Sequence, residues 1–171
     1  MSVNYKPSVA HHRANIAMTQ EIQKSPSLAP KSHVSKYIAL IPAAGIGTRM
    51  ASSLPKQYLM IAGKTVLQHT VAAFLANPTI FNTYVLVSES DEYVDTALEC
   101  HEKLHVLRCG GASRQETVEN GLRCIAQMQD LAYSDWILVH DAARPGLTSE
   151  LIDKLILAIG SLHSKIFSRI S

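Results

Sequence analysis

The sequence predicts an α/β fold in which a mainly parallel sheet carries helices on both faces, a Rossmann-like arrangement. Short apolar runs of strand length alternate with longer segments whose apolar residues recur at helical spacing. This alternation is typical of units that place parallel strands in one sheet. Glycine-rich or charged segments follow three of the apolar runs, at the strand ends where such sheets bind ligands.

The composition is that of an ordinary globular protein. The chain has 171 residues, of which 47% are apolar and 18% are charged, enough for one domain with a core. The formal net charge of +2 and the lack of a membrane-length apolar run exclude nucleic acid and membrane as expected partners. The three cysteines lack metal-ligand spacing, which indicates a reduced, cytoplasmic protein.

The first 36 residues differ from the rest of the chain. They are rich in Ser, Pro, Lys and His and show no apolar periodicity, so residues 1–36 are predicted to form a disordered tail before a domain at 37–171. No apolar central region of a secretory signal is present. An organelle transit peptide and a translation start at Met18 are the alternatives.

The first half of the domain contains two predicted strands and two predicted helices. Tyr37–Ile41 is a buried strand that ends in small residues, and Thr83–Val87 is a β-branched strand. Thr65–Leu75 and Asp91–Cys100 are predicted helices. The apolar face expected of the first helix consists of Leu67, Val71, Phe74 and Leu75.

The second half repeats the alternation. Leu104–Leu107 and Trp136–Val139 are predicted strands, and Gln115–Met128 and Ser149–Leu162 are predicted helices, with Ser149 as the N-cap of the last. The residues expected to face the core are Val118, Leu122 and Ile125 in the first of these helices, and Leu151, Leu155, Ile156 and Ile159 in the second.

The loop Pro42–Lys56 is the most informative segment of the chain. Gly45 and Gly47 allow the backbone to approach a ligand and expose its N–H groups, and Arg49 and Lys56 add positive charge beside them. Such a loop is suited to holding a polyphosphate and stabilising charge that develops on it. The alternative is a simple strand-to-helix turn with exposed cations.

Two familiar phosphate-binding motifs are not satisfied. The dinucleotide fingerprint that would begin at Gly45 requires a glycine where Met50 stands. The sequence Gly63-Lys64-Thr65 resembles the end of a P-loop, but Tyr58 occupies the position of the first glycine. This second segment is instead predicted to be a turn that leads into the following helix.

The segment Cys109–Arg114 has two interpretations. Ser113 would cap the next helix and Arg114 would lie on the surface of a simple glycine turn. Alternatively, the backbone around Gly111 forms a wall against a flat base, and Thr117 offers a hydroxyl group.

The segment Val139–Pro145 ends a predicted strand with an acid, two small residues and an arginine. In one interpretation, Asp141 and Arg144 form a structural ion pair at a turn. Alternatively, Asp141 lies near a nucleotide ribose or a phosphate-bound Mg²⁺, since hard cations prefer carboxylate and phosphate oxygens. We expect His140 to be packed or hydrogen-bonded rather than to act as a base.

Together these segments resemble a known family. The sequences PAAGIGTRM with PKQY, GGASRQETVENGL and VHDAARP match, in order and spacing, the motifs of 2-C-methyl-D-erythritol 4-phosphate cytidylyltransferases, over about residues 37–160. The ribitol-phosphate cytidylyltransferases share much of this pattern. The resemblance implies a nucleotidyltransferase that uses CTP, a sugar-alcohol phosphate and Mg²⁺, and that releases pyrophosphate.

The resemblance also implies roles for individual residues. Arg49 and Lys56 would be catalytic, neutralising the α-phosphate and the leaving pyrophosphate, while Asp141 would lie near the ribose and the metal. Arg144 would support its loop. The residues implied to bind the nucleotide are Pro42, Ala43, Ala44, Gly45, Gly111, Thr117, Asp141 and Ala142. The family usually has serine in place of Thr117, so the hydroxyl is retained.

The chain departs from the family at its C-terminus. Family members continue beyond the helix expected to end near Ser161, and residues 164–171 do not resemble that continuation. We therefore expect a truncated domain that keeps the CTP-side motifs and lacks most of the acceptor pocket and the arm of the family's homodimer. One alternative is a catalytically inactive nucleotide-binding fragment. The other is a nicotinamide-dependent oxidoreductase, and Met50 and Lys56 disfavour this second alternative.

Overall fold

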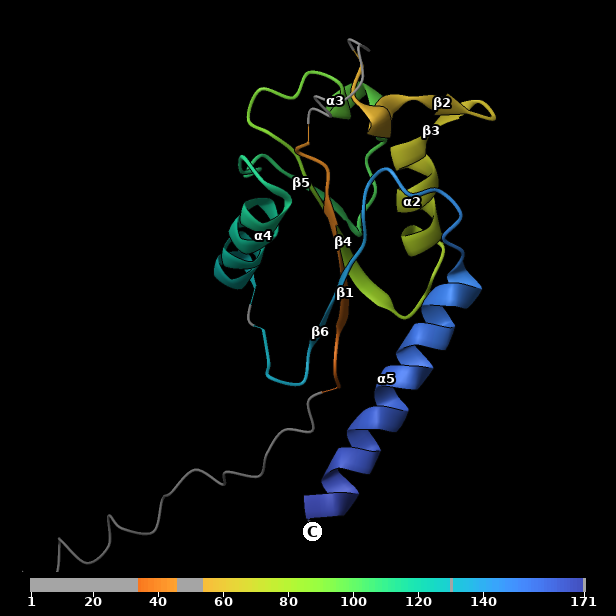
Figure 1. Cartoon of the computed structure of the whole chain (residues 1–171), viewed down its shortest axis with the longest axis vertical. Coiled ribbons are helices and arrows are strands. Elements are labelled where there is room, and N and C mark those ends of the chain that lie inside the picture. The colour runs from red at the N-terminus through yellow and green to blue at the C-terminus, as the bar shows by residue number, and fades with distance from the viewer. Residues whose placement is uncertain (1–33, 46–53, 130, 171) are drawn as a thin grey trace, which may run out of the picture. The chain divides into compact units, whose positions relative to one another are not determined.

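The computed structural model describes residues 34–45, 54–129 and 131–170, without the side chains of 162–170 (Figure 1). Its main sheet has the strand order β5-β4-β1-β6, and every pairing in it is parallel. The strands are β1 (Tyr37–Pro42), β4 (Ile80–Leu86), β5 (Leu104–Leu107) and β6 (Trp136–Val139). The predicted α/β fold is confirmed, and β4 begins three residues before the predicted Thr83.

The central strand β1 is buried on both faces. Ala39 and Ile41 belong to the core on the side of α2 (Val66–Leu75), whereas Ile38 and Leu40 belong to the core on the side of α4 (Arg114–Met128). Figure 1 shows these two helices on opposite sides of the sheet. Because successive strand residues face opposite sides, the double cover explains why the sequence of β1 is continuously apolar.

The helix α2 begins as the sequence predicts. Ala62 and Gly63 have positive φ angles of 48° and 80° and connect the short antiparallel strands β2 (Met60–Ile61) and β3 (Lys64–Thr65). Thr65 then caps the helix, accepting from the backbone of Gln68, whose side chain accepts from the Thr65 N–H. The glycine-lysine-threonine segment is therefore a turn into a helix. Leu67, Val71 and Phe74 of α2 are buried, as predicted.

The predicted helix at Asp91–Cys100 is only the single turn α3 (Val94–Ala97). Asp91 Oδ1 accepts hydrogen bonds from the N–H groups of Tyr93 and Val94, both at 3.0 Å, so the helix starts late. Leu98 adopts an extended conformation and ends it.

The helix α4 is confirmed, with Ser113 as its N-cap, but its buried face differs from the prediction. Ile125 is fully buried and Val118 packs against the core, as predicted, but Leu122 is 38% exposed, and Thr117 and Gly121 face the sheet in its place. A Cβ atom at Gly121 would collide with the buried side chain of Leu86. The absence of a side chain at this position therefore allows the helix to approach the sheet closely.

The helix α5 (Ser149–Ile170) is rotated relative to the prediction. Ile156 and Ile159 pack against the core, as predicted, but Leu151 and Leu155 are about half exposed, and Ile152 is buried in their place. Thr148 Oγ1, not Ser149, accepts from a backbone N–H of the first turn.

A fully buried asparagine explains the rotation of α5. The Asn77 amide donates to Ser149 Oγ at 3.1 Å and to Asp153 Oδ1 at 2.7 Å, so these two polar residues face the protein. With Ser149 and Asp153 bonded to Asn77, the apolar row Ile152, Ile156 and Ile159 of α5 faces the core. Among the described residues, none of the helices combines the length and apolar character needed to cross a bilayer.

The close approach at Gly121 leads to a test with a matched pair of glycines. We expect Gly121→Ala to lower the free energy of unfolding by about 1–3 kcal/mol, because overpacking against Leu86 outweighs the higher helix propensity of alanine. Gly160→Ala, in α5 with open space around it, should raise stability by about 0.5–1 kcal/mol. Urea unfolding measures both, and a stabilised Gly121→Ala variant would contradict the packing.

Candidate active site

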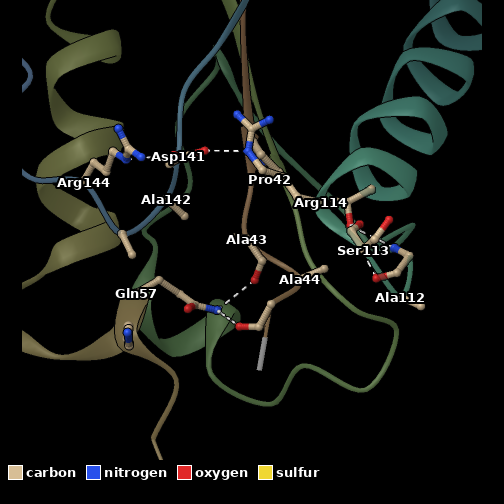
Figure 2. Close-up of a pocket in the computed structure, with 15 residues that line it drawn as sticks. Pro42, Ala43, Ala44, Gln57, Ala112, Ser113, Arg114, Asp141, Ala142 and Arg144 are labelled. Carbon is tan, nitrogen blue, oxygen red and sulfur yellow. Dashed lines mark hydrogen bonds and ion pairs between the residues drawn. The ribbon is translucent and has the colours of Figure 1, made fainter. Parts of the chain in front are cut away.

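A cleft of about 430 Å³ lies at the carboxyl ends of β1 and β6, beside the loop that precedes α4. The chain passes from β1 to β4 on one side and places β6 on the other, so the cleft is at a topological switch point of the sheet. The cleft is lined by Pro42, Ala43, Ala44, Gly45, Lys56, Gln57, Gly111, Ala112, Ser113, Arg114, Thr117, Asp141, Ala142, Ala143 and Arg144 (Figure 2). Three segments distant in sequence therefore meet there, as predicted.

The strip after β1, which consists of Ala43–Gly45, forms the floor of the cleft. The N–H of Ala43 donates to the carbonyl of Leu86 at 2.7 Å and continues the pairing with β4 beyond Pro42. The side-chain amide of Gln57 donates to the carbonyl of Ala43 at 2.8 Å and to that of Gly45 at 3.4 Å (Figure 2). Gln57 is buried, so these bonds fix the course of the strip.

Sequence reasoning did not assign a role to Gln57. The residue is part of the PKQY match, but its partners lie 12 and 14 positions away and no spacing rule connects them.

One of the two predicted catalytic cations lies at the cleft. Lys56 opens the short helix η2 (Lys56–Tyr58) and is exposed. Arg49 lies outside the described residues, so its role stays a prediction.

The Gly110-Gly111 pair packs directly against the strip. The N–H of Gly110 donates to the carbonyl of Val87 at 2.8 Å, and a Cβ atom at Gly110 would collide with that carbonyl and with the methyl group of Ala44. Only glycine allows these two loops to touch.

Thr117 ties the glycine loop to α4. Its hydroxyl accepts from the N–H of Gly111 at 3.0 Å and donates to the carbonyl of Ser113 at 2.9 Å. Thr117 is buried, so its hydroxyl holds the wall of the cleft in shape. The Ala112 N–H is held in turn by the carboxylate of Glu116 at 2.8 Å.

Asp141 binds two arginines. Its Oδ1 accepts from Arg114 Nε at 2.7 Å, and its Oδ2 lies 2.9 Å from Arg144 Nε. The hydrogen bond from Arg114 lowers the pKa of Asp141, and the charges of Arg114 and Arg144 act in the same direction. The structural pair with Arg144 is thus present, and Arg114 is a second partner that the sequence did not predict.

The same contacts limit metal binding by the protein alone. Both oxygens of Asp141 face guanidinium groups, and the described residues contain no group of three or more His, Cys, Asp or Glu side chains placed to hold a metal. Asp141 is the single acid among the described lining residues. These residues therefore do not fit a resident Mg²⁺ site, and Asp141 as a metal ligand stays a prediction.

The neighbours of Asp141 have structural contacts. His140 packs edge-on against Phe74, with ring centroids 5.9 Å apart, as expected of a packed histidine. Ala142 is buried, and its carbonyl lies 3.4 Å from the hydroxyl of Thr70 in α2. The loop after β6 is thereby held against α2.

The paired carboxylate gives a pH prediction. Because the pKa of Asp141 is lowered in the folded protein, its stabilising contribution is complete above the ordinary value of about 4 and is lost as the pH falls through the folded pKa. The stability difference between wild type and Asp141→Asn should therefore be constant near neutral pH and shrink below about pH 4. Urea unfolding between pH 7 and pH 2.5 measures it.

Glu119→Gln is the control for this experiment. Glu119 pairs with Arg123 at 2.6 Å, but both side chains are more than half exposed, and such pairs contribute little. Its difference from wild type should be small at every pH. A difference for Asp141→Asn that does not change with pH would contradict the pairing.

Known proteins resemble this chain over about three quarters of its length. The family model for 2-C-methyl-D-erythritol 4-phosphate cytidylyltransferase matches residues 37–166. The chain is 44% identical over 127 residues to the enzyme of that name from Nitrosospira multiformis, covering 72% of this chain and 54% of the relative. It is 45% identical over 124 residues to that from Burkholderia multivorans, covering 72% and 52%.

A crystal structure of 4-diphosphocytidyl-2C-methyl-D-erythritol synthase superposes with a TM-score of 0.65 at 40% identity, covering 75% of this chain and 56% of that one. This chain therefore spans about half the length of the relatives it matches. The matched region contains all three segments that meet at the cleft. The chain belongs to the 2-C-methyl-D-erythritol 4-phosphate cytidylyltransferase family.

Proposed function

We propose that this chain binds CTP in the cleft and serves cytidylyl transfer from CTP to 2-C-methyl-D-erythritol 4-phosphate, a step in the non-mevalonate route to isoprenoids. The observation that carries the proposal is the single cleft in which the strip after β1, Lys56, the Gly111 wall and Asp141 meet. A cationic loop and a flat backbone wall are complementary to a triphosphate and a base, respectively.

The proposed arrangement of the nucleotide follows from the lining. The base lies against the wall of Gly111 and Ala112, and the ribose lies near Asp141. The triphosphate lies over the backbone of Ala43–Gly45, where Lys56 supplies positive charge. Arg49, outside the described residues, is proposed to add a second cation.

The chemistry requires charge stabilisation rather than a base. An anionic oxygen of the acceptor phosphate attacks the α-phosphorus of CTP, and the bond from that phosphorus to the leaving pyrophosphate breaks. The attacking oxygen already carries the electron pair it needs, so no proton has to be removed. Lys56 is proposed to stabilise the negative charge that accumulates on the phosphates during the transfer.

We propose that Mg²⁺ enters with the triphosphate as part of the substrate. Mg²⁺ is commonly bound by substrate phosphates with few protein carboxylates. That mode suits a cleft whose single described acid is paired with two arginines.

The proposed partners are CTP and a sugar-alcohol phosphate, without a nucleic acid or a membrane, and the proposed location is the cytoplasm. The net charge of +2 provides no extended field for a nucleic acid or a lipid surface. Cys100, Cys109 and Cys124 are free thiols, as is usual in a reducing compartment.

Calorimetry tests the nucleotide proposal. In the presence of Mg²⁺, we expect CTP to bind to the chain more tightly than ATP, because the chain belongs to a family of cytidylyltransferases. Binding of NADH in preference to CTP would overturn the proposal, and a protein that binds neither would also contradict it.

Turnover tests the catalytic role of Lys56. Where the chain turns over CTP and the methylerythritol phosphate, Lys56→Ala should lower kcat by about 100-fold or more while changing CTP affinity much less, since the lysine acts mainly on developing charge. Lys64→Ala, on β3 outside the cleft, is the control. Pyrophosphate release measures both variants. CTP binding without any turnover would favour the inactive nucleotide-binding fragment.

A further inference from the structure

The short helix η2 carries three successive side chains that point to three different parts of the protein. Lys56 lies at the cleft, Gln57 is bonded to the strip after β1, and Tyr58 is bonded to Asp91 in the segment that follows β4. The last of these contacts lies outside the cleft lining and has no role in the proposed chemistry.

The Tyr58–Asp91 contact is well defined. The Tyr58 hydroxyl donates to Asp91 Oδ2 at 2.8 Å, and the Tyr58 side chain is almost fully buried. Burial, together with the hydrogen bond and the charge of Asp91, raises the pKa of Tyr58 well above its ordinary value. The phenol therefore remains a neutral donor throughout the physiological pH range.

Asp91 is itself held on several sides. Its Oδ1 accepts from the N–H groups at the start of α3. Arg108 donates to the backbone carbonyl of Asp91 at 2.7 Å and to the carboxylate of Asp95 at 2.7 Å. The rings of Tyr58 and Tyr93 lie 5.2 Å apart. Tyr58 is thus fastened to a site that connects β4, α3 and the end of β5.

Backbone hydrogen bonds within η2 connect the anchored Tyr58 to Lys56. The N–H of Tyr58 donates to the carbonyl of Pro55 at 2.9 Å, and the N–H of Leu59 donates to that of Lys56 at 3.2 Å. Lys56 is exposed and has a long, flexible side chain, so its direction depends on the backbone from which it projects.

We propose that Tyr58 and Asp91 are positioning residues that hold the backbone of Lys56 at the cleft. This inference rests on the proposed function, because it assigns the purpose of the contact to the placement of the phosphate-binding cation. Loss of the hydrogen bond leaves the ring in place and frees η2 to move, so the lysine spends less time at the triphosphate.

Tyr58→Phe removes the hydroxyl alone. Tyr84→Phe is the matched control, because Tyr84 is equally buried, accepts from Gln129 Nε2 at 3.2 Å and belongs to the core on the other face of the sheet. Both variants lose the side-chain hydrogen bonding of a buried tyrosine hydroxyl. Only the first should affect η2.

Amide hydrogen exchange is the first measurement and needs no ligand. Tyr58→Phe should speed exchange at the backbone amides of positions 58 and 59 by about fivefold or more, whereas Tyr84→Phe should not. Equal exchange in wild type and Tyr58→Phe would overturn the proposal, whether or not CTP binds.

Acetylation of lysines, followed by mass spectrometry, is the second measurement. Near-saturating CTP should slow the acetylation of Lys56 by about tenfold in wild type and in Tyr84→Phe. In Tyr58→Phe, at its own near-saturating CTP concentration, we expect protection of about threefold or less, with Lys64 as an unprotected internal reference.

The two measurements separate this proposal from the proposed function. Full protection of Lys56 in Tyr58→Phe would overturn the positioning role while leaving CTP binding intact. A wild-type protein in which CTP protects no lysine would contradict the proposed function, and amide exchange alone would then decide whether Tyr58 holds the backbone of Lys56.

Discussion

The close contact between the strip after β1 and the Gly110-Gly111 loop is the constraint on which the cleft depends. Ala44 and Gly110 are so close that no side chain fits at the glycine. The strip can reach that loop because β1 is central, paired on one side with β4 and on the other with β6. Burial of β1 on both faces fixes its register, and the fixed register places the residues after β1 beside the Gly110-Gly111 loop.

The described lining of the cleft is held in shape by hydrogen bonds within the protein. Gln57 satisfies carbonyls of the strip, Thr117 satisfies the glycine loop, and Asp91 holds the helix that carries Lys56. Each of these side chains forms its hydrogen bonds with other groups of the protein. The backbone of the lining is therefore shaped before a ligand arrives, which reduces the entropy that binding would cost.

Much of this arrangement was predictable because it is local. The strands follow from apolar runs, α2 follows from Thr65 and its periodic face, and the meeting of three segments follows from parallel topology. The predictions are wrong where a residue distant in sequence determines which face of a helix is buried. Leu122 and Leu151 satisfy helical spacing, but Gly121 and the buried Asn77 select the neighbouring rows. The Tyr58–Asp91 pair spans 33 positions without any repeating pattern, so the sequence alone does not reveal it.

The charges of the cleft suit the polyanion that is proposed to bind there, although the chain as a whole is nearly neutral. The net charge of the whole sequence is +2, yet the described lining contains Lys56, Arg114 and Arg144 against the single acid Asp141. Asp141 lies between the two guanidinium groups and reduces their mutual repulsion, so both remain beside the cleft without a ligand. Since the arginines are more than half exposed, their ion pairs with Asp141 cost little in desolvation.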